Sequence, residues 1–333
     1  MSIGVLGGGS WGTALAILLA DKGYKTVIWS RNKDQVEDMN DTRINNKYLP
    51  GVTFPEKLHV TNNIEDAIKD RKVILLSVPT HSIRQVLNDN KHIINNNQII
   101  VNVAKGIEND TLKRVSEIVD EILPNNKYVM LSGPSHAEEV AVHIPTTVVS
   151  SSKCKETAEY IQDIFMTSNF RVYTNPDVIG VELGGALKNI IALAAGITDG
   201  LEYGDNTKAA LMTRGTFEMA RLGVALGADK STFSGLSGVG DLIVTCTSMH
   251  SRNRRAGILI GQGKTVEEAT KEVGMVVEGI KTTKSAYKLA EKYNIEMPIT
   301  NELYKVLYEG SDVCEAVNNL MGRPKKHETE SIS

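Results

Sequence analysis

The first half of the chain alternates short apolar runs, rich in β-branched residues, with segments of helical pattern, and this alternation constrains the fold most. Strands of a parallel sheet that helices cover on both faces are almost continuously apolar. The pattern therefore predicts a doubly wound α/β domain of the Rossmann type. The predicted strands are 3–7, 26–30, 73–78, 99–103, 129–132 and 146–150, and the predicted helices include 11–21, 82–87 and 111–123.

The predicted strands stop soon after Ser150, and from about Pro176 onward the sequence has only helical patterns. A chain of 333 residues is long enough for about two domains. We therefore predict an N-terminal Rossmann-type domain followed by an all-helical C-terminal domain. The predicted ranges are 1–180 for the first domain, 181–325 for the second and 326–333 for a flexible polar tail.

Composition excludes several classes of protein. A formal net charge of −3 gives no bulk attraction to nucleic acid, and an aromatic content of 5% argues against a stacking platform for single strands. No stretch approaches the ~20 apolar residues of a membrane-spanning helix, since the runs 73–78 and 190–196 are too short. The N-terminus lacks the pattern of a signal peptide. We expect a cytoplasmic protein with no stable membrane insertion.

The cysteines suggest neither disulfides nor metal. Cys154, Cys246 and Cys314 are odd in number, far apart and without C-x-x-C spacing. We expect free thiols in a reducing compartment and no metal site.

A glycine-rich turn follows the first predicted strand and opens the first predicted helix. Gly7, Gly9 and Gly12 match the G-x-G-x-x-G pattern in that context. The first glycine permits a tight turn, the second lets the backbone approach a pyrophosphate, and the third lets helix and strand pack closely. The N–H groups at the helix start then face the anion. The turn predicts a dinucleotide site.

The end of the second predicted strand indicates which dinucleotide. NAD-specific sites carry an acidic residue there for the ribose hydroxyls, but this chain has Ser30 and Arg31. An arginine can pair with a 2′-phosphate, which a carboxylate would repel. The sequence therefore favours NADP(H), with NAD(H) as the second possibility.

Two further segments follow predicted strands of the first domain. Lys105 comes directly after the strand 99–103, and the turn Gly133-Pro134-Ser135 comes after the strand 129–132. Ligands of doubly wound sheets bind at the carboxyl ends of the strands. We expect the lysine to offer charge to a phosphate or a carbonyl, and the turn to present its backbone to the ligand.

A lysine inside an apolar helix is the strongest candidate for acid–base chemistry. Lys188 and Asn189 lie within the segment 182–196, which is apolar almost all round and so predicted to be buried. Burial of an ammonium is expensive unless the group is paired or loses its proton. A lysine whose pKa falls in this way can serve as a general acid or base near neutral pH.

Two later segments supply partners for that lysine and for an anion. Asp241 lies beside an apolar run and can pair with a buried lysine. Ser251, Arg252 and Asn253 offer a hydroxyl, a guanidinium and an amide in succession, a set that suits a phosphate monoester.

Six segments, in this order, resemble the bacterial soluble family of NAD(P)-dependent glycerol-3-phosphate dehydrogenases. They are GGGSWGTALA, VAKGIE, LSGPSHAEEV, ELGGALKNIIALAAGI, GLSGVGDLIVTC and SRNRRAG. The resemblance covers nearly the whole chain. It implies reversible hydride transfer between NAD(P)H and dihydroxyacetone phosphate, a supply of sn-glycerol 3-phosphate for phospholipid synthesis, and a homodimer.

The resemblance also implies roles for particular residues. Lys188 is similar to the family's acid/base, Lys105 to a lysine that touches both cofactor and substrate, and Asp241 and Thr245 to its active-site supports. The implied substrate contacts are Lys105, Gly133, Ser135, Lys188, Asn189, Asp241, Ser251, Arg252 and Asn253. The implied cofactor contacts are Gly7, Gly9, Ser10, Trp11, Gly12, Arg31, Lys105, Ala137, Arg252, Val276 and Glu278.

Two alternatives remain open at this point. A β-hydroxyacid or 6-phosphogluconate-type dehydrogenase also joins a dinucleotide domain to a helical one and uses a lysine. A dinucleotide-sensing regulator could keep the fold without catalysis, although the presence of Lys188, Asp241 and Arg252 argues against it.

Overall fold

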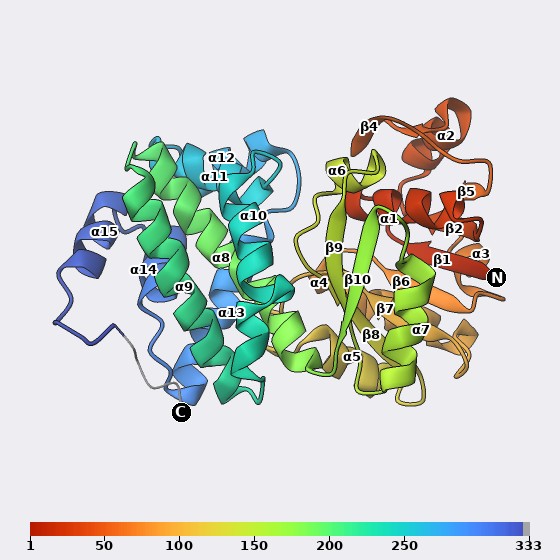
Figure 1. The fold of residues 1–333 in the computed structure, drawn as a ribbon. Helices are drawn as coiled ribbons and strands as arrows, with labels where there is room; N and C mark the ends of the chain where they lie inside the picture. Colours follow the sequence, from red (N-terminus) through yellow and green to blue (C-terminus); the bar gives the residue numbers. More distant parts are fainter. Residues whose placement is uncertain (329–333) are drawn as a thin grey trace. The chain divides into compact units, whose positions relative to one another are not determined.

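The computed structural model describes residues 1–328, which form two compact units (Figure 1). The doubly wound unit comprises 1–104 and 115–178, and the helical unit comprises 105–114 and the described residues from 179 onward. The Rossmann-type fold followed by a helical domain is confirmed.

One eight-stranded sheet forms the centre of the doubly wound unit, with the strand order β10-β9-β8-β7-β6-β1-β2-β5. All neighbouring pairs are parallel except β8 and β9, which are antiparallel. The strands are β1 (Ser2–Leu6), β2 (Lys25–Trp29), β5 (Leu58–Thr61), β6 (Val73–Leu76), β7 (Ile99–Asn102), β8 (Lys127–Ser132), β9 (Thr146–Ser151) and β10 (Phe170–Asn175).

The two edge strands, β5 and β10, escaped the sequence analysis, and the expectation that strands end soon after Ser150 was wrong. In β10, Phe170 and Val172 are buried while Arg171 and Tyr173 are exposed. An edge strand with one solvated face alternates apolar and polar residues, so it shows no continuous apolar run. The central strands β6 and β7 are buried throughout, which is why their runs were recognised.

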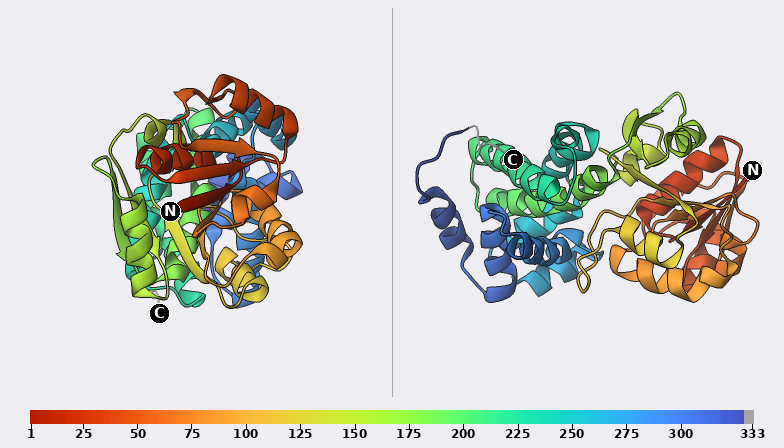
Figure 2. Two further views of the ribbon diagram at one scale, coloured as in Figure 1. Left: turned by 90° about the vertical axis from the view of Figure 1, so that its right-hand side faces the viewer. Right: turned by 90° about the horizontal axis from the view of Figure 1, so that it is seen from below.

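Helices cover both faces of this sheet (Figures 1 and 2). Side chains of β1 alternate between two buried clusters: Val5 joins one with Leu15 of α1, and Leu6 joins the other with Ile83 of α4. The helical segments are α1 (Ser10–Asp21), α2 (Lys33–Thr42), α3 (Ile64–Ile68), α4 (Thr80–Asn90), η1 (Lys91–Ile93), α5 (Val115–Ile122), α6 (Ala137–Ala141) and α7 (Lys155–Phe165). A two-stranded ribbon, β3 (Ile44–Asn45) and β4 (Leu49–Thr53), follows α2.

The described part of the helical unit contains helices and loops around its own core. Its elements are α8 (Val178–Gly200), α9 (Asp205–Ala225), η2 (Lys230–Ser234), η3 (Leu236–Gly240), α10 (Asp241–Thr247), α11 (Arg252–Gly261), α12 (Val266–Val273), α13 (Glu278–Tyr293), α14 (Pro298–Tyr304), η4 (Lys305–Glu309) and α15 (Val313–Met321).

The helix α8 corrects one expectation about membranes. Its 23 residues are long and apolar enough to cross a bilayer by length and composition, although no such stretch was expected. Within the described residues it is the single helix that passes this test, and 89% of its apolar window is buried in the protein. A core helix that is apolar all round accounts for these properties.

The segment 105–114 belongs to the helical unit by its contacts, whereas the sequence analysis grouped it with the first domain. Ile107 lies in the helical unit's core, Asn109 accepts a hydrogen bond from Ser285, and Arg114 forms an ion pair with Glu182 at 2.8 Å. The helix expected over 111–123 begins only at Val115, after this segment.

Of the predicted tail, 326–333, the structure describes residues 326–328. Residues 329–333 lie outside the described part of the chain. Lys326, the first residue of that range, forms an ion pair with Glu296.

Candidate active site

In the glycine turn between β1 and α1, two glycines lie so close to other backbone atoms that a side chain would not fit. Gly7 adopts a φ of +127°, and a Cβ there would lie 2.7 Å from the Ser77 carbonyl carbon. A Cβ on Gly12 would lie 2.2 Å from the Gly7 oxygen. Both positions therefore require glycine.

The space in front of Gly9 is open. A Cβ on Gly9 would meet no atom within 4 Å. Gly9 is the N-cap of α1, no side chain caps the helix, and Ser10 and Trp11 are its first residues. The indole Nε1 of Trp11 is buried without a hydrogen-bond partner in the described residues. A helix start with uncapped N–H groups beside open space suits a pyrophosphate, so these residues fit a dinucleotide.

The two residues after β2 differ in environment. Ser30 is 7% exposed, and its hydroxyl donates a hydrogen bond to Gln35 Oε1 at 2.9 Å. Arg31 is exposed and forms no ion pair within residues 1–328. Of the two, Arg31 is the side chain that is available to a ligand.

The turn after β8 places three predicted residues in the doubly wound unit. Gly133 has a φ of +144°, and a Cβ there would lie 2.9 Å from the Val148 Cα. Ser135 donates its hydroxyl to the Gly133 carbonyl at 2.9 Å, and Ala137 is the first residue of α6. A side chain at position 133 would therefore disturb the turn.

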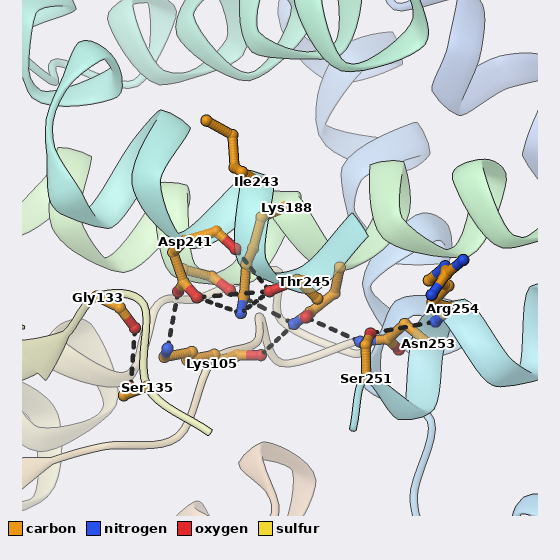
Figure 3. A network of polar contacts seen from close by, with 12 residues as sticks. Lys105, Gly133, Ser135, Lys188, Asp241, Ile243, Thr245, Ser251, Asn253 and Arg254 are labelled. Carbon is orange, nitrogen blue, oxygen red and sulfur yellow. Dashed lines mark hydrogen bonds and ion pairs between the residues drawn. The ribbon is translucent and has the colours of Figure 1, made fainter. Parts of the chain in front are cut away.

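Two lysines share one buried aspartate in the helical unit (Figure 3). Lys188 Nζ lies 2.5 Å from Asp241 Oδ1, and Lys105 Nζ lies 2.7 Å from Asp241 Oδ2. Lys188 also donates to Thr245 Oγ1 at 2.7 Å, while the Thr245 hydroxyl donates to the Asp241 carbonyl at 2.6 Å. The Asp241 side chain is 1% exposed and that of Lys188 8%.

Burial lowers the pKa of Lys188 to about 8. Desolvation is the largest cause, the Asp241 carboxylate opposes it, and the positive charge of Lys105 adds to it. Both protonation states of Lys188 are therefore accessible near neutral pH. An ammonium carries three protons, and Asp241 and Thr245 accept two of them, so one is left for another oxygen.

Close backbone packing brings Asp241 to α8. The π-helical turn η3 ends directly before Asp241, and a Cβ on Gly184 of α8 would lie 2.4 Å from the Ser237 oxygen in that turn. Turns of this kind often mark functional sites. The absence of a side chain at Gly184 thus permits the packing that sets the position of the carboxylate.

Glycines also join α8 to α11. A Cβ on Gly196 would lie 2.1 Å from the Arg254 oxygen, and one on Gly257 would lie 2.2 Å from the Leu193 oxygen. This contact lets the amides of Asn189 and Asn253 meet: Asn253 Nδ2 donates to Asn189 Oδ1 at 2.9 Å.

Both amides of this pair form a further hydrogen bond to the backbone. Asn189 Nδ2 donates to the Lys105 carbonyl at 3.2 Å, and Asn253 Oδ1 accepts the Gly279 N–H at 2.8 Å. The chain of bonds therefore joins the backbone beside Lys105 to the first turn of α13, which begins at Glu278. Val276 lies in the loop before this helix and is half-buried.

The N-terminus of α11 carries the predicted anion-binding residues. Ser251 caps the helix by accepting the Arg254 N–H at 3.2 Å, and Arg252 is the first helical residue. The Arg254 guanidinium is held by Asp199 at 2.7 Å, and Asp199 also pairs with Lys208 at 2.6 Å. Asp199 lies on α8 and Lys208 on α9, so these ion pairs join the start of α11 to both helices.

The predicted residues fall into three groups. The first is a single network of Lys105, Lys188, Asn189, Asp241, Thr245 and Asn253. The second lies at the starts of two helices of the same unit: Ser251 and Arg252 at α11, Val276 and Glu278 at α13. The predicted residues of the doubly wound unit lie in the glycine turn and in the segments after β2 and β8.

Several supporting residues have no signal in the sequence. Asp199, Gln35 and Asn45 were not predicted, because a single polar residue in a helix or strand carries no recognisable motif. Among residues 1–328, no group of three or more His, Cys, Asp or Glu side chains could hold a metal ion.

A doubly wound unit with this glycine turn, followed by a helical unit with a buried lysine–aspartate network, defines a dinucleotide-binding α/β protein with an acid–base centre. The models of the NAD-dependent glycerol-3-phosphate dehydrogenase family match this chain over both parts. The N-terminal model matches residues 2–158 and the C-terminal model residues 177–318.

Individual relatives agree with the family models. Glycerol-3-phosphate dehydrogenase [NAD(P)+] of a Thermoanaerobacter species is 57% identical over 332 residues, and the match covers both chains completely. That of Clostridium perfringens is 56% identical, with 98% of each chain covered. The solved structure of the Coxiella burnetii enzyme is 40% identical, with a TM-score of 0.94 over 97% of this chain and 99% of that one. This chain belongs to the NAD-dependent glycerol-3-phosphate dehydrogenase family.

Proposed function

We propose that the protein catalyses reversible hydride transfer between NAD(P)H and dihydroxyacetone phosphate, giving sn-glycerol 3-phosphate. The observation that carries this proposal is the buried contact of Lys188 with Asp241 and Thr245, in a chain of this family. The reaction needs a group that gives a proton to a ketone oxygen and takes it back from a secondary alcohol. A lysine with a pKa of about 8 can do both.

Lys188 acts as the acid in the direction of reduction and as the base in the direction of oxidation. The nicotinamide, when bound, supplies or accepts the hydride. Negative charge develops on the ketone oxygen during reduction, and the remaining proton of the ammonium neutralises it. Asp241 and Thr245 hold the ammonium by accepting its other two protons, so the donor is oriented before the reaction begins.

The other residues of the helical unit bind and orient the substrate. Lys105 is fixed by Asp241 and offers a second positive charge to substrate and cofactor. Arg252, with Ser251 and Asn253, holds the phosphate, since a guanidinium fork suits phosphate oxygens. Binding energy from the phosphate, which does not react, serves to position the carbonyl. In the doubly wound unit, Gly133 and Ser135 contribute further substrate contacts.

The doubly wound unit binds the dinucleotide. Gly7, Gly9 and Gly12 shape the turn, and Ser10 and Trp11 meet the pyrophosphate at the start of α1. The exposed Arg31 favours NADP(H) over NAD(H) because it can pair with the 2′-phosphate. Further cofactor contacts come from Lys105, Ala137, Arg252, Val276 and Glu278.

In the cell, the enzyme supplies glycerol 3-phosphate for phospholipid synthesis as a cytoplasmic homodimer. Its partners are small molecules, with no nucleic acid and no membrane insertion. Sedimentation equilibrium tests the dimer: a mass of twice the chain is expected, and a monomeric mass at working concentration contradicts it.

A substrate comparison tests the proposed reaction. The protein is given NADP+ or NAD+ with glycerol 3-phosphate, with 6-phosphogluconate or with small β-hydroxyacids, and nucleotide reduction is followed. We expect turnover of glycerol 3-phosphate and little with the others. Turnover of a hydroxyacid without glycerol 3-phosphate oxidation would assign a related dehydrogenase, and binding without any turnover would assign a dinucleotide sensor.

A further inference from the structure

Two side-chain amides meet behind the glycine turn, on a single carbonyl oxygen. Gln35 Nε2 donates to the Gly8 oxygen at 2.7 Å, and Asn45 Nδ2 donates to the same oxygen at 3.0 Å. Gln35 lies on α2 and Asn45 on β3, so the two donors come from different elements. Neither residue belongs to the G-x-G-x-x-G pattern.

The two amides are themselves held by the protein. Asn45 is fully buried, donates also to Thr13 Oγ1 at 2.8 Å and accepts the Tyr48 N–H at 3.2 Å. Gln35 accepts the hydroxyl of Ser30 at 2.9 Å. The donors are therefore fixed before any ligand binds.

This arrangement determines the direction of one N–H group. In a planar trans peptide, the carbonyl of Gly8 and the N–H of Gly9 point in opposite directions. With the carbonyl held by two amides, the Gly9 N–H points away from Gln35 and Asn45. A Cβ on Gly9 would meet nothing within 4 Å, so the space beside this residue is open to a ligand. No hydrogen bond within residues 1–328 uses that N–H.

The network also joins the turn to the region that follows β2. Ser30 contacts Gln35, and a Cβ on Gly8 would lie 3.0 Å from the Ser30 Cβ. Gln35 therefore contacts both the backbone of the glycine turn, at Gly8, and Ser30, the residue before Arg31.

We propose that Gln35 and Asn45 are positioning residues of the dinucleotide turn, which aim the Gly9 N–H at the pyrophosphate by holding the Gly8 carbonyl. This inference rests on the proposed binding of NAD(P)(H) at the turn. Because Gln35 also contacts Ser30, its loss weakens binding of the whole dinucleotide, and not of the nicotinamide alone.

The test replaces each amide with the carboxyl of the same shape, Gln35→Glu and Asn45→Asp. Each change removes the donor to the Gly8 oxygen and, when ionised, sets a negative charge beside it. The same unit offers matched controls. Gln98 Nε2 donates to the Ile68 and Arg71 carbonyls at 2.7 Å each, and Asn126 Nδ2 donates to the Asn95 and Gln98 carbonyls at 2.8 and 2.9 Å.

The measurements are the Kd for NADPH by fluorescence, the KM for NADPH and for dihydroxyacetone phosphate, and the melting temperature. We expect Gln35→Glu and Asn45→Asp to weaken NADPH binding about tenfold or more, with a much smaller change in the KM for dihydroxyacetone phosphate. Gln98→Glu and Asn126→Asp lower the melting temperature but leave NADPH binding within about threefold of the unsubstituted protein.

A pH series separates positioning from general damage. In Gln35→Glu, protonation of the introduced carboxyl restores a donor, so NADPH binding recovers as pH falls, relative to the unsubstituted protein. If a carboxyl variant does not fold, Gln35→Met removes the donor without adding charge and is measured in its place.

Unchanged NADPH binding in Gln35→Met and the carboxyl variants overturns the inference. Equal losses in the Gln98 and Asn126 controls also overturn it, since the effect then reflects stability. If the unsubstituted protein binds no dinucleotide, the proposed function itself fails, and this outcome is distinct because it appears before any substitution.

Discussion

At the scale of single residues, the chemistry depends on Asp241, whose two carboxylate oxygens bind two different lysines. Asp241 Oδ1 holds Lys188 and Oδ2 holds Lys105, so two positive charges lie on one buried carboxylate. Burial and the neighbouring cation lower the pKa of Lys188, while Asp241 limits that decrease. The outcome is a group that can change its charge under physiological conditions.

The first prediction concerns pH. Reduction of the ketone needs the ammonium form of Lys188, so its rate falls as pH rises through about 8; oxidation needs the neutral amine, so its rate rises over the same range. Lys105→Ala removes a charge that lowers the pKa of Lys188, and we expect both midpoints to shift upward. Initial rates in both directions across pH provide the measurement. Midpoints that do not move in Lys105→Ala contradict the assignment.

The second prediction concerns Arg31. Arg31→Ala removes the partner proposed for the 2′-phosphate, so the ratio of kcat/KM for NADPH to that for NADH falls about tenfold or more. Lys33→Ala is the control, because Lys33 is a nearby exposed cation that pairs with Glu37 at 3.8 Å. A ratio that is unchanged in Arg31→Ala, or that falls equally in both variants, excludes this role.

At the scale of helices and strands, burial decided what could be predicted. The central strands were recognised because both faces are buried, and the edge strand β10 was missed because Arg171 and Tyr173 face solvent. The segment 105–114 was assigned to the first domain because it lies among the predicted strands, ahead of a boundary placed near residue 180. Its long-range contacts with Asp241, Ser285 and Glu182 have no local signature.

In the candidate site too, local sequence predicted the burial of single residues but not the contacts between distant ones. Lys188 was predicted as a buried group because an apolar helix surrounds it in the sequence. Its proximity to Asp241 was a hypothesis, since 53 residues separate them, and the distance of 2.5 Å depends on tertiary packing. The amide contact between Asn189 and Asn253 and the contacts of Gln35 and Asn45 with the Gly8 carbonyl likewise depend on packing that no motif records.

The third prediction concerns a buried carboxyl on α9. Glu218 is 3% exposed and accepts the N–H groups of Ile299 and Thr300 at 2.6 and 3.2 Å, which caps α14. Burial raises its pKa from 4.5 to about 7. A raised pKa in the folded state gives stability that is present below the unfolded value and is lost as pH rises through the folded one.

The Glu218→Gln variant isolates this effect. Between about pH 5 and about pH 8, the melting temperature of the unsubstituted protein falls relative to that of Glu218→Gln, because the variant has no carboxyl to ionise. Thermal unfolding of both proteins over this range provides the measurement. Melting temperatures that follow parallel courses with pH would show that Glu218 does not titrate in this window.

At the scale of the whole molecule, the chain joins two units with separate tasks. The doubly wound unit carries the glycine turn and Arg31, and the helical unit carries both lysines, because the segment 105–114 brings Lys105 to Asp241. The match to the family extends over both units, and the solved Coxiella burnetii structure agrees over 97% of the chain. The proposed reaction uses residues of both units, since the glycine turn and the two lysines lie in different ones.

The most direct test of that activity follows the near-ultraviolet absorbance of NADPH after addition of dihydroxyacetone phosphate. We predict that the unsubstituted protein oxidises NADPH and forms glycerol 3-phosphate, and that Lys188→Ala loses at least about 100-fold in kcat while its Kd for NADPH stays nearly unchanged. A near-normal rate in Lys188→Ala would rule out Lys188 as the acid/base, and no NADPH oxidation by the unsubstituted protein would rule out the proposed reaction.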